Sequence, residues 1–458
     1  MTAVRMTNPF SFRGRLSRLP YALWSVGVFF SQHLAILVMF WMQGIPLQPN
    51  PTFYMIPFRW LVTHSKVSDL TAIVALAYVL MVTWALVSLA FRRAADANAP
   101  AWVAAMAIAQ PVQIPFILFL CFAPPVAPMN RSRDDDLPAA SDIAWRIAAL
   151  GVVTGVGLTL ASVAMGALVF GSYGYGMFVV SPVAIGATTG YLLNRAGDIG
   201  PSQTALFVAF STILGGLTLV GVGLEGIVCI ILAAPIGIAV ALVGGTLGRA
   251  IARRTRRPPV SAFAVLPLVF AVETALPAST NFDTTETIAV AAPPAWVWQS
   301  IVNMETIDEP PALPFRLGVA YPLRGEVIGS GVGAVRYGEF STGTAIERVT
   351  AWAPDRKLAF VVERNVPGMR ELSPYEHVHA PHVVGYFLTT STSFELEPLP
   401  DGGTAIVEHT SHVLKLDPVF YWLPMARWVV HANNARVLAH ISREGERRFR
   451  QSAVSPIP

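Results

Sequence analysis

The sequence predicts an all-α polytopic membrane bundle of about 7–8 spans, followed by an α+β domain in which a curved antiparallel sheet holds one long C-terminal helix. The chain has 458 residues, of which 53% are hydrophobic and only 13% charged, whereas soluble domains carry about 25% charged residues. Its long apolar runs all precede residue 283. After that position charged residues return, and polar and apolar residues begin to alternate. The first half is therefore membrane-embedded and the second half is a folded soluble domain.

Charge and cysteine content exclude several classes of protein. Residues 1–282 carry a net charge of +8 and residues 283–458 one of −4. The basic residues lie between apolar runs rather than on one soluble face, so we expect no nucleic-acid partner. Cys121 and Cys229 lie in separate apolar runs, which predicts neither a disulfide framework nor a cysteine metal site.

Eight apolar segments are candidate spans, because a spanning helix needs about 20 mostly apolar residues. They are 21–43, 69–91, 101–123, 143–170, 175–194, 203–223, 226–248 and the weaker 260–277. The first segment lacks a small-residue cleavage pattern, so we interpret it as a retained span. The later segments are rich in glycine, which favours close helix packing in lipid.

Arginines flank the first two segments. Since basic residues favour the cytoplasmic side, the N-terminus is predicted to be cytoplasmic. These arginines either determine topology or bind anionic lipid headgroups; they are Arg13, Arg15, Arg18, Arg92 and Arg93.

The strongest basic loop conflicts with this topology. "RAIARRTRR", residues 249–257, follows the seventh segment, and counting spans from a cytoplasmic N-terminus places it outside, against the positive-inside rule. Either one segment does not span or the loop is an exception, and the proline-containing run "AIAQPVQIPF" could be re-entrant. The sequence leaves the side of residues 283–458 open.

Two stretches near the N-terminus carry a family resemblance. "NPFSFRGRLSRLPYALW" and "FRRAADANAPAW" resemble the two motifs of the YhaH-like bacterial inner-membrane proteins, domain of unknown function 805. The second stretch lacks the family's Leu-His pair. The resemblance covers about residues 8–125 and implies a bacterial inner-membrane location without any assigned chemistry. We therefore predict a YhaH-like membrane domain over 1–128 and a second helical membrane region over 129–282.

The second half has the pattern of an α+β domain. "TTETIAVAA" predicts a strand and "PPAWVWQSIVNM" a short helix. "GAVRYGEF", "TAIERVTAW" and "KLAFVVERN" predict further strands, and "PDGG" joins two more in a hairpin. The long stretch after Asp417 and Pro418 predicts the C-terminal helix.

The opening of this half also carries a resemblance. "IAVAAPPAWVWQSIVN" is similar to the entry of the START-like SRPBCC (polyketide cyclase/dehydrase and lipid-transport) superfamily. The resemblance implies a helix-grip fold over 283–450, with 451–458 as a tail, and an apolar cavity between sheet and helix.

Several residues are candidates for ligand binding in such a cavity. Alternation places Arg336 and Glu339 on opposite faces of one strand, and a solvent-facing strand charge is the competing interpretation for Arg336. The complete candidate set is Arg336, Glu339, Ser341, Glu371, Tyr375, His377, His379, His382, Tyr386, Trp428 and His431.

Three of these histidines lie in "YEHVHAPHVVGY", residues 375–386. They fall in a connection of about 20 residues, a length typical of functional lids and binding loops. Three interpretations of this loop remain open: the rim or lid of a pocket, a polar loop, or an imidazole zinc site. For the protein as a whole we predict neither a metal nor a cofactor.

We therefore expect a membrane protein whose soluble domain binds an apolar or amphipathic molecule near the bilayer. Lipid-, quinone- and polyketide-like compounds are the expected ligand classes. Its expected partners are membrane lipids and this ligand. A membrane-anchored cyclase or hydrolase-like enzyme and an envelope sensor or scaffold are the alternatives. The sequence does not identify the ligand, the oligomeric state or any reaction.

Overall fold

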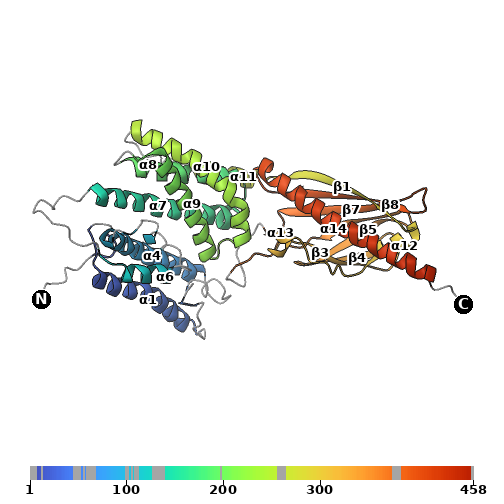
Figure 1. Ribbon diagram of the computed structural model, residues 1–458, viewed down its shortest axis with the longest axis horizontal. Helices are drawn as coiled ribbons and strands as arrows, with labels where there is room; N and C mark the ends of the chain where they lie inside the picture. Colours follow the sequence, from blue (N-terminus) through green and yellow to red (C-terminus); the bar gives the residue numbers. More distant parts are fainter. Residues whose placement is uncertain are drawn as a thin grey trace, which may run out of the picture. The chain divides into compact units, whose positions relative to one another are not determined.

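The structure is a computed structural model of the chain, and it describes residues 8–11, 14–44, 53–54, 57, 69–97, 99, 103–104, 107, 113–125, 140–195, 199–254, 265–373 and 383–454. The chain divides into two compact units, which we describe separately (Figure 1). The first holds the apolar helices and the second holds the sheet with its helices.

The first unit is entirely helical. Its helices are α1 (Arg18–Met42), α4 (Asp69–Ala97), α6 (Gln113–Phe122), α7 (Ala140–Ala164), the π-helical segments η3 (Met165–Phe170) and η4 (Gly176–Val180), α8 (Ser181–Arg195), α9 (Pro201–Gly221), α10 (Ile227–Arg254) and α11 (Leu266–Ala275). Within the described residues, five helical stretches are long and apolar enough to cross a membrane: Arg18–Met42, Ile147–Phe170, Gly176–Arg195, Pro201–Gly221 and Ile227–Arg253. The prediction of several membrane-spanning helices, as in a multi-pass membrane protein, is thus confirmed.

Two of the eight predicted segments correspond to short helices. The segment 260–277 contains α11, and 101–123 contains α6 together with residues outside the described ranges. Each helix has ten residues, so at 1.5 Å per residue it is about 15 Å long. That length is half of the ~30 Å hydrocarbon core, and neither helix can cross it alone.

Helix α1 shows why these helices suit lipid. Many of its large apolar side chains point outward, with Leu19 and Leu23 each more than two-thirds exposed, while Phe29, Ile36 and Phe40 pack inside the bundle. Its polar side chains Ser25, Gln32 and His33 are buried in the bundle. In lipid, this arrangement satisfies polar groups inside the protein and leaves apolar groups to the acyl chains.

Helices α8 and α10 pack through glycines. A Cβ atom built on Gly186 of α8 would overlap the carbonyl oxygen of Ala241, and one built on Gly248 of α10 would overlap that of Ala187. Gly190 and Gly244 also approach backbone carbonyl oxygens of the facing helix too closely for a Cβ atom. Glycines four residues apart on both helices therefore set the distance between their backbones.

The second unit is an α+β domain with one sheet. Its elements are β1 (Thr280–Val290), α12 (Pro294–Val302), β2 (Asn303–Met304), α13 (Leu313–Arg316), β3 (Pro322–Ile328), β4 (Val335–Phe340), β5 (Gly343–Ala353), β6 (Lys357–Arg364), β7 (Phe387–Pro398), β8 (Thr404–Leu414) and α14 (Val419–Val454). The strand order is β1-β8-β7-β6-β5-β4-β3-β2, with antiparallel neighbours throughout. Helix α14 lies along the curled sheet (Figure 1) and packs against β1, β8 and α12.

The predicted elements of this domain are present. The two strands around "PDGG" are β7 and β8, and the long helix is α14, which runs through Pro424. The apolar core joins the sheet to α12 and the later part of α14, through Val297, Leu358, Ile406, Leu438 and Ile441. This is the helix-grip arrangement expected from the sequence.

Candidate functional site

The inner face of the helix-grip sheet carries polar residues next to its apolar core. Along β8, Ile406, Glu408, Thr410 and His412 are all buried, whereas His409 between them is exposed. Successive side chains of a strand point to opposite faces. The alternation therefore places a carboxylic acid, a hydroxyl and an imidazole on the face that the helix covers.

Arg336 of β4 is buried on this face beside a carboxylate. Its guanidinium donates to Glu347, its cross-strand partner on β5. The guanidinium also lies 4.6 Å from the ring centroid of Phe360 on β6. Gly325 and Gly338 pair with each other on β3 and β4 and leave room for the ion pair, because a Cβ atom on either one would crowd it.

Glu408 faces a second carboxylate across the strand pair. Its partner in the register is Glu286 of β1, and two like charges directly opposite each other are unfavourable. Burial raises the pKa of Glu408 to about 8, the charge of Glu286 adds to the rise, and Arg336 opposes it. At neutral pH Glu408 is thus a protonated acid. The carboxylate of Glu286 lies within hydrogen-bonding distance of Nδ1 of His431 on α14.

A closed hydrogen-bond network surrounds His412. Its Nε2 lies 2.9 Å from the hydroxyl of Thr410, which lies 2.6 Å from that of Thr284. Asn434 of α14 donates to both hydroxyls, at 3.2 and 3.3 Å, and His412 Nδ1 lies 3.2 Å from the hydroxyl of Thr389. Burial lowers the pKa of His412 to about 4. The imidazole is therefore neutral, and both of its nitrogens have partners.

Two groups on the inner face remain without such partners. Within the described part of the chain, Oε2 of Glu408 and Nε of Arg336 are buried and have no hydrogen-bond partner. The two residues are only 3% and 7% exposed. Most buried polar atoms in folded proteins are hydrogen-bonded, so each exception needs an explanation.

Helix α14 carries other unpartnered buried atoms near a different part of the domain. They include Nε of Arg436 and Oδ1 of Asn433. The rest of these side chains is bound close to β3, since Asn433 donates to the carbonyl oxygen of Ala320 and Arg436 lies over the ring of Tyr321. Tyr321 and Ala320 immediately precede β3, so this group is separate from Glu408.

The structure brings together only part of the predicted ligand set. Arg336 is buried on the inner face and acts on Glu408. His431 is exposed and contacts Glu286, the cross-strand partner of Glu408. Glu339 is half-buried on the opposite face, as its position in the alternation predicts, and its carboxylate lies 4.0 Å from Arg324. The hydroxyl of Ser341 accepts the backbone N–H of Tyr321 at 3.2 Å.

The other predicted ligand residues lie elsewhere or outside the described residues. Glu371 is half-buried, and burial raises the pKa of the half-buried Tyr386. Trp428 is half-exposed and stacks on Phe315 at 6.1 Å. Four predicted residues fall outside the described ranges: Tyr375, His377, His379 and His382. The lid and metal interpretations of their loop stay predictions, and the described residues contain no cluster of three metal-ligating side chains.

Three of the five predicted membrane arginines hydrogen-bond backbone carbonyl groups of the first unit. Arg93 is fully buried and donates from Nε to the carbonyl oxygen of Leu120 at 3.0 Å, and Arg18 donates from Nε to that of Ala123 at 2.9 Å. Both thereby cap the C-terminal end of α6. Arg92 donates to the backbone of Asn8 at 3.2 Å. Arg15 is exposed, and Arg13 lies outside the described residues.

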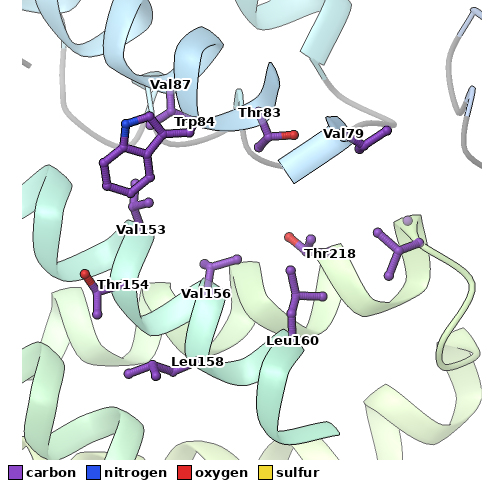
Figure 2. Close-up of a pocket in the computed structure, with 13 residues that line it drawn as sticks. Val79, Thr83, Trp84, Val87, Val153, Thr154, Val156, Leu158, Leu160 and Thr218 are labelled. Atoms are coloured by element: carbon purple, nitrogen blue, oxygen red, sulfur yellow. The ribbon is translucent and has the colours of Figure 1, made fainter. Parts of the chain in front are cut away.

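A pocket of about 360 Å³ lies in the first unit, between α4, α7 and α9. Figure 2 shows Trp84 and Val87 on one side of it, facing Val153 and Val156 on the other. Its lining contains threonine hydroxyls but no charged side chain. The pocket can accept an apolar chain, and it offers no acid or base for a reaction.

Comparisons with known proteins match the two halves separately. Residues 9–131 match a family described as "Protein of unknown function (DUF805)". The N-terminal part of the chain is a DUF805 region. This agrees with the resemblance of its two motifs, which meet in the structure where Leu16 N–H donates to the carbonyl oxygen of Arg92 at 3.1 Å. No curated protein matches the chain.

The second half matches solved structures over its whole extent. The Zhui aromatase/cyclase from a Streptomyces species is 19% identical, over 37% of this chain and 96% of its own, with a TM-score of 0.25. A protein from Nitrosomonas europaea is 14% identical over 38% and 97%, with a TM-score of 0.23. The Aha1 dimer protein from Colwellia psychrerythraea is 16% identical over 36% and 96%, with a TM-score of 0.21. The helix-grip assignment itself rests on the strand order and α14, and the ligand is not shown.

Sequence reasoning missed the acids of the inner face. Glu347 and Glu408 each occupy the strand positions that otherwise carry apolar or small residues, as in Ala345, Glu347 and Val349 of β5. A charged residue at an inward position was the available signal. It was ambiguous because the outward positions of the same strands also mix polar and apolar residues.

Proposed function

We propose that the helix-grip domain binds an amphipathic small molecule near the bilayer, with the polar end of the molecule at Arg336 and Glu408. One observation carries this proposal: two buried polar atoms in the grip have no partner among the described residues. Leaving a buried polar group unsatisfied costs about 1–3 kcal/mol. A ligand that hydrogen-bonds both groups would offset that cost.

The rest of the inner face supports an amphipathic ligand rather than a fully polar one. Phe360 and Phe394 lie beside the polar groups, with ring centroids 6.4 Å apart, and both are buried. Phe282 is stacked on His412 at 5.1 Å. A molecule seated here would contact aromatic carbon over most of its length, which suits lipid-, quinone- or polyketide-like compounds.

Small molecules extracted from the purified full chain test this proposal. The comparison is a chain that ends after residue 279, before β1, and keeps the membrane helices. We expect mass spectrometry to find at least one amphipathic compound, near one per protein, in the full chain alone. Identical extracts from the two proteins would contradict the proposal.

A membrane-anchored cyclase or hydrolase-like enzyme is the second candidate function. The Glu286 and Glu408 pair supports it, because two neighbouring carboxyl groups in different protonation states can act as base and acid. Substitution of Glu286 by Gln would then abolish turnover of the extracted compound while leaving its binding in place. Unchanged chemical composition of that compound on incubation with the protein would count against an enzyme.

We further propose six spans, with both the N-terminus and the helix-grip domain in the cytoplasm. α4 has 29 residues and would cross as a sixth span beside the five stretches above, whereas α6 and α11 are too short. This count places the basic loop 249–257 inside, so the conflict in the sequence disappears. Arg195 would also lie inside, and the loop after α1, with Arg59 and Lys66, would be the exception.

Membrane lipids are the partners that this topology implies, and fusions to the C-terminus test it. A reporter active only in the cytoplasm should give signal, and one active only outside should stay silent. The reverse pattern would show an odd number of spans.

A further inference from the structure

The buried polar side chains of the inner face form a cluster of two groups, and only one group has atoms without a hydrogen-bond partner among the described residues. His412, Thr410, Thr284 and Asn434 satisfy one another. The unpartnered positions are Nε of Arg336 and Oε2 of Glu408. A guanidinium N–H is always a donor, and a protonated carboxyl group donates through its O–H. The cluster therefore presents donors.

The cluster has no spare positive charge among the described residues. Arg336 is paired with Glu347 inside the domain, and Glu286 contributes a further negative charge beside His431. A ligand carboxylate or phosphate would have to be buried without a free positive charge near it. Burying an uncompensated charge is strongly unfavourable.

We infer that the polar end of the ligand is uncharged and carries oxygen acceptors, such as an ester, ketone or quinone carbonyl, which Arg336 and the Glu408 carboxyl bind. This inference rests on the proposed function and adds the chemical class of the ligand. A carbonyl oxygen has two lone pairs and can accept from such donors. The buried rings of Phe360 and Phe394 hold the apolar part.

The donor from Glu408 exists only while that carboxyl is protonated. Among the described residues, two charged side chains act on it: Glu286, its cross-strand partner on β1, and Arg336 of β4. Glu286 in turn contacts His431 of α14, and Arg336 is paired with Glu347 of β5. Burial keeps its pKa at about 8. Above that pH the donor is lost and a negative charge appears, so an oxygen acceptor should bind less well.

Three photoactivatable probes with the same diazirine-bearing octadecyl chain test the inference on the full chain in detergent. One ends in a methyl ester, one in a sulfonate that stays anionic, and one in a methyl group without oxygen. Peptide mapping after irradiation measures labelling within residues 280–454. The probes are compared on the wild type, Glu408→Gln, Glu408→Leu and the outer-face control Glu395→Gln at pH 6 to 9.

We expect the methyl ester to label these peptides at least about tenfold more than the sulfonate, a discrimination of about 1.4 kcal/mol. Wild-type labelling should fall as the pH rises past 8. In Glu408→Gln it should persist and become independent of pH, because the amide N–H remains a donor. In Glu408→Leu it should fall well below the wild-type level at pH 6, because only the Arg336 donor remains for the ester oxygen.

The outcomes separate the inference from the proposed function. No labelling of residues 280–454 by any probe would refute ligand binding itself. Equal or stronger labelling by the sulfonate would refute an uncharged polar end but leave ligand binding in place. Equal labelling of wild type and Glu408→Leu by the ester would refute recognition by these donors. Equal labelling of the wild type by all three probes would refute it as well.

Discussion

Replacing Glu408 by glutamine should stabilise the helix-grip domain increasingly as the pH rises. The pKa of Glu408 is raised from 4.5 to about 8 in the folded protein. Between these values the unfolded chain loses the proton while the folded chain keeps it, so the wild type loses stability with rising pH. Each pH unit corresponds to about 1.4 kcal/mol. The loss is therefore about 1 kcal/mol at pH 5, about 3 at pH 7 and about 5 well above pH 8.

Amide hydrogen exchange in the full chain measures this difference in stability between the wild type and Glu408→Gln. The slowest amides of β1 and β8, the strands that carry Glu286 and Glu408, report the opening of the sheet. Wild type and variant are compared at each pH, so that the intrinsic exchange rates cancel. At pH 7 these amides should exchange roughly 300-fold more slowly in Glu408→Gln, and at pH 5 only about fourfold more slowly.

The change with pH is the decisive quantity, because a glutamine that simply packs better would shift stability equally at every pH. A ratio that stays constant from pH 5 to pH 8 would show that Glu408 is not a buried neutral acid. Glu395→Gln provides the control: its ion pair with Lys357, at 2.7 Å, lies on the exposed face of the sheet. Such surface pairs contribute less than about 1 kcal/mol.

Three further substitutions test other parts of the structure. Arg336→Met should cost about 3–5 kcal/mol, because it leaves Glu347 buried without its cation, and adding Glu347→Leu should recover most of that loss in denaturant titrations. Gly248→Ala should lower the thermal stability of the membrane unit, because the added Cβ atom would overlap the carbonyl oxygen of Ala187 on α8. Gly237→Ala should not, because its Cβ atom would meet open space. Arg93→Met removes a buried cap of α6 and should reduce the amount of folded protein in membranes. Wild-type stability in Arg336→Met or Gly248→Ala, or a wild-type amount of folded protein in Arg93→Met, would contradict the role given to that contact.

The division of the chain into two halves could be predicted from the sequence. Apolar runs of about 20 residues require a nonpolar surrounding, whatever their neighbours are. Strand alternation likewise placed Arg336 and Glu339 on opposite faces, and the structure shows Arg336 buried and Glu339 half-buried on the other face. These properties depend only on residues close together along the chain.

The candidate site could not be predicted in the same way. A period of two separates the faces of a strand but does not say which face the helix covers. The opposition of Glu286 and Glu408 depends on the pairing of β1 with β8, two strands more than 100 residues apart. The position of Arg336 over Phe360 depends on the curl of the sheet. The sequence by itself determined the membrane half, the strands and the gripped helix, because local hydropathy and periodicity decide them. Only the tertiary structure decided which charges are buried together, because burial and pairing follow from the register between distant strands.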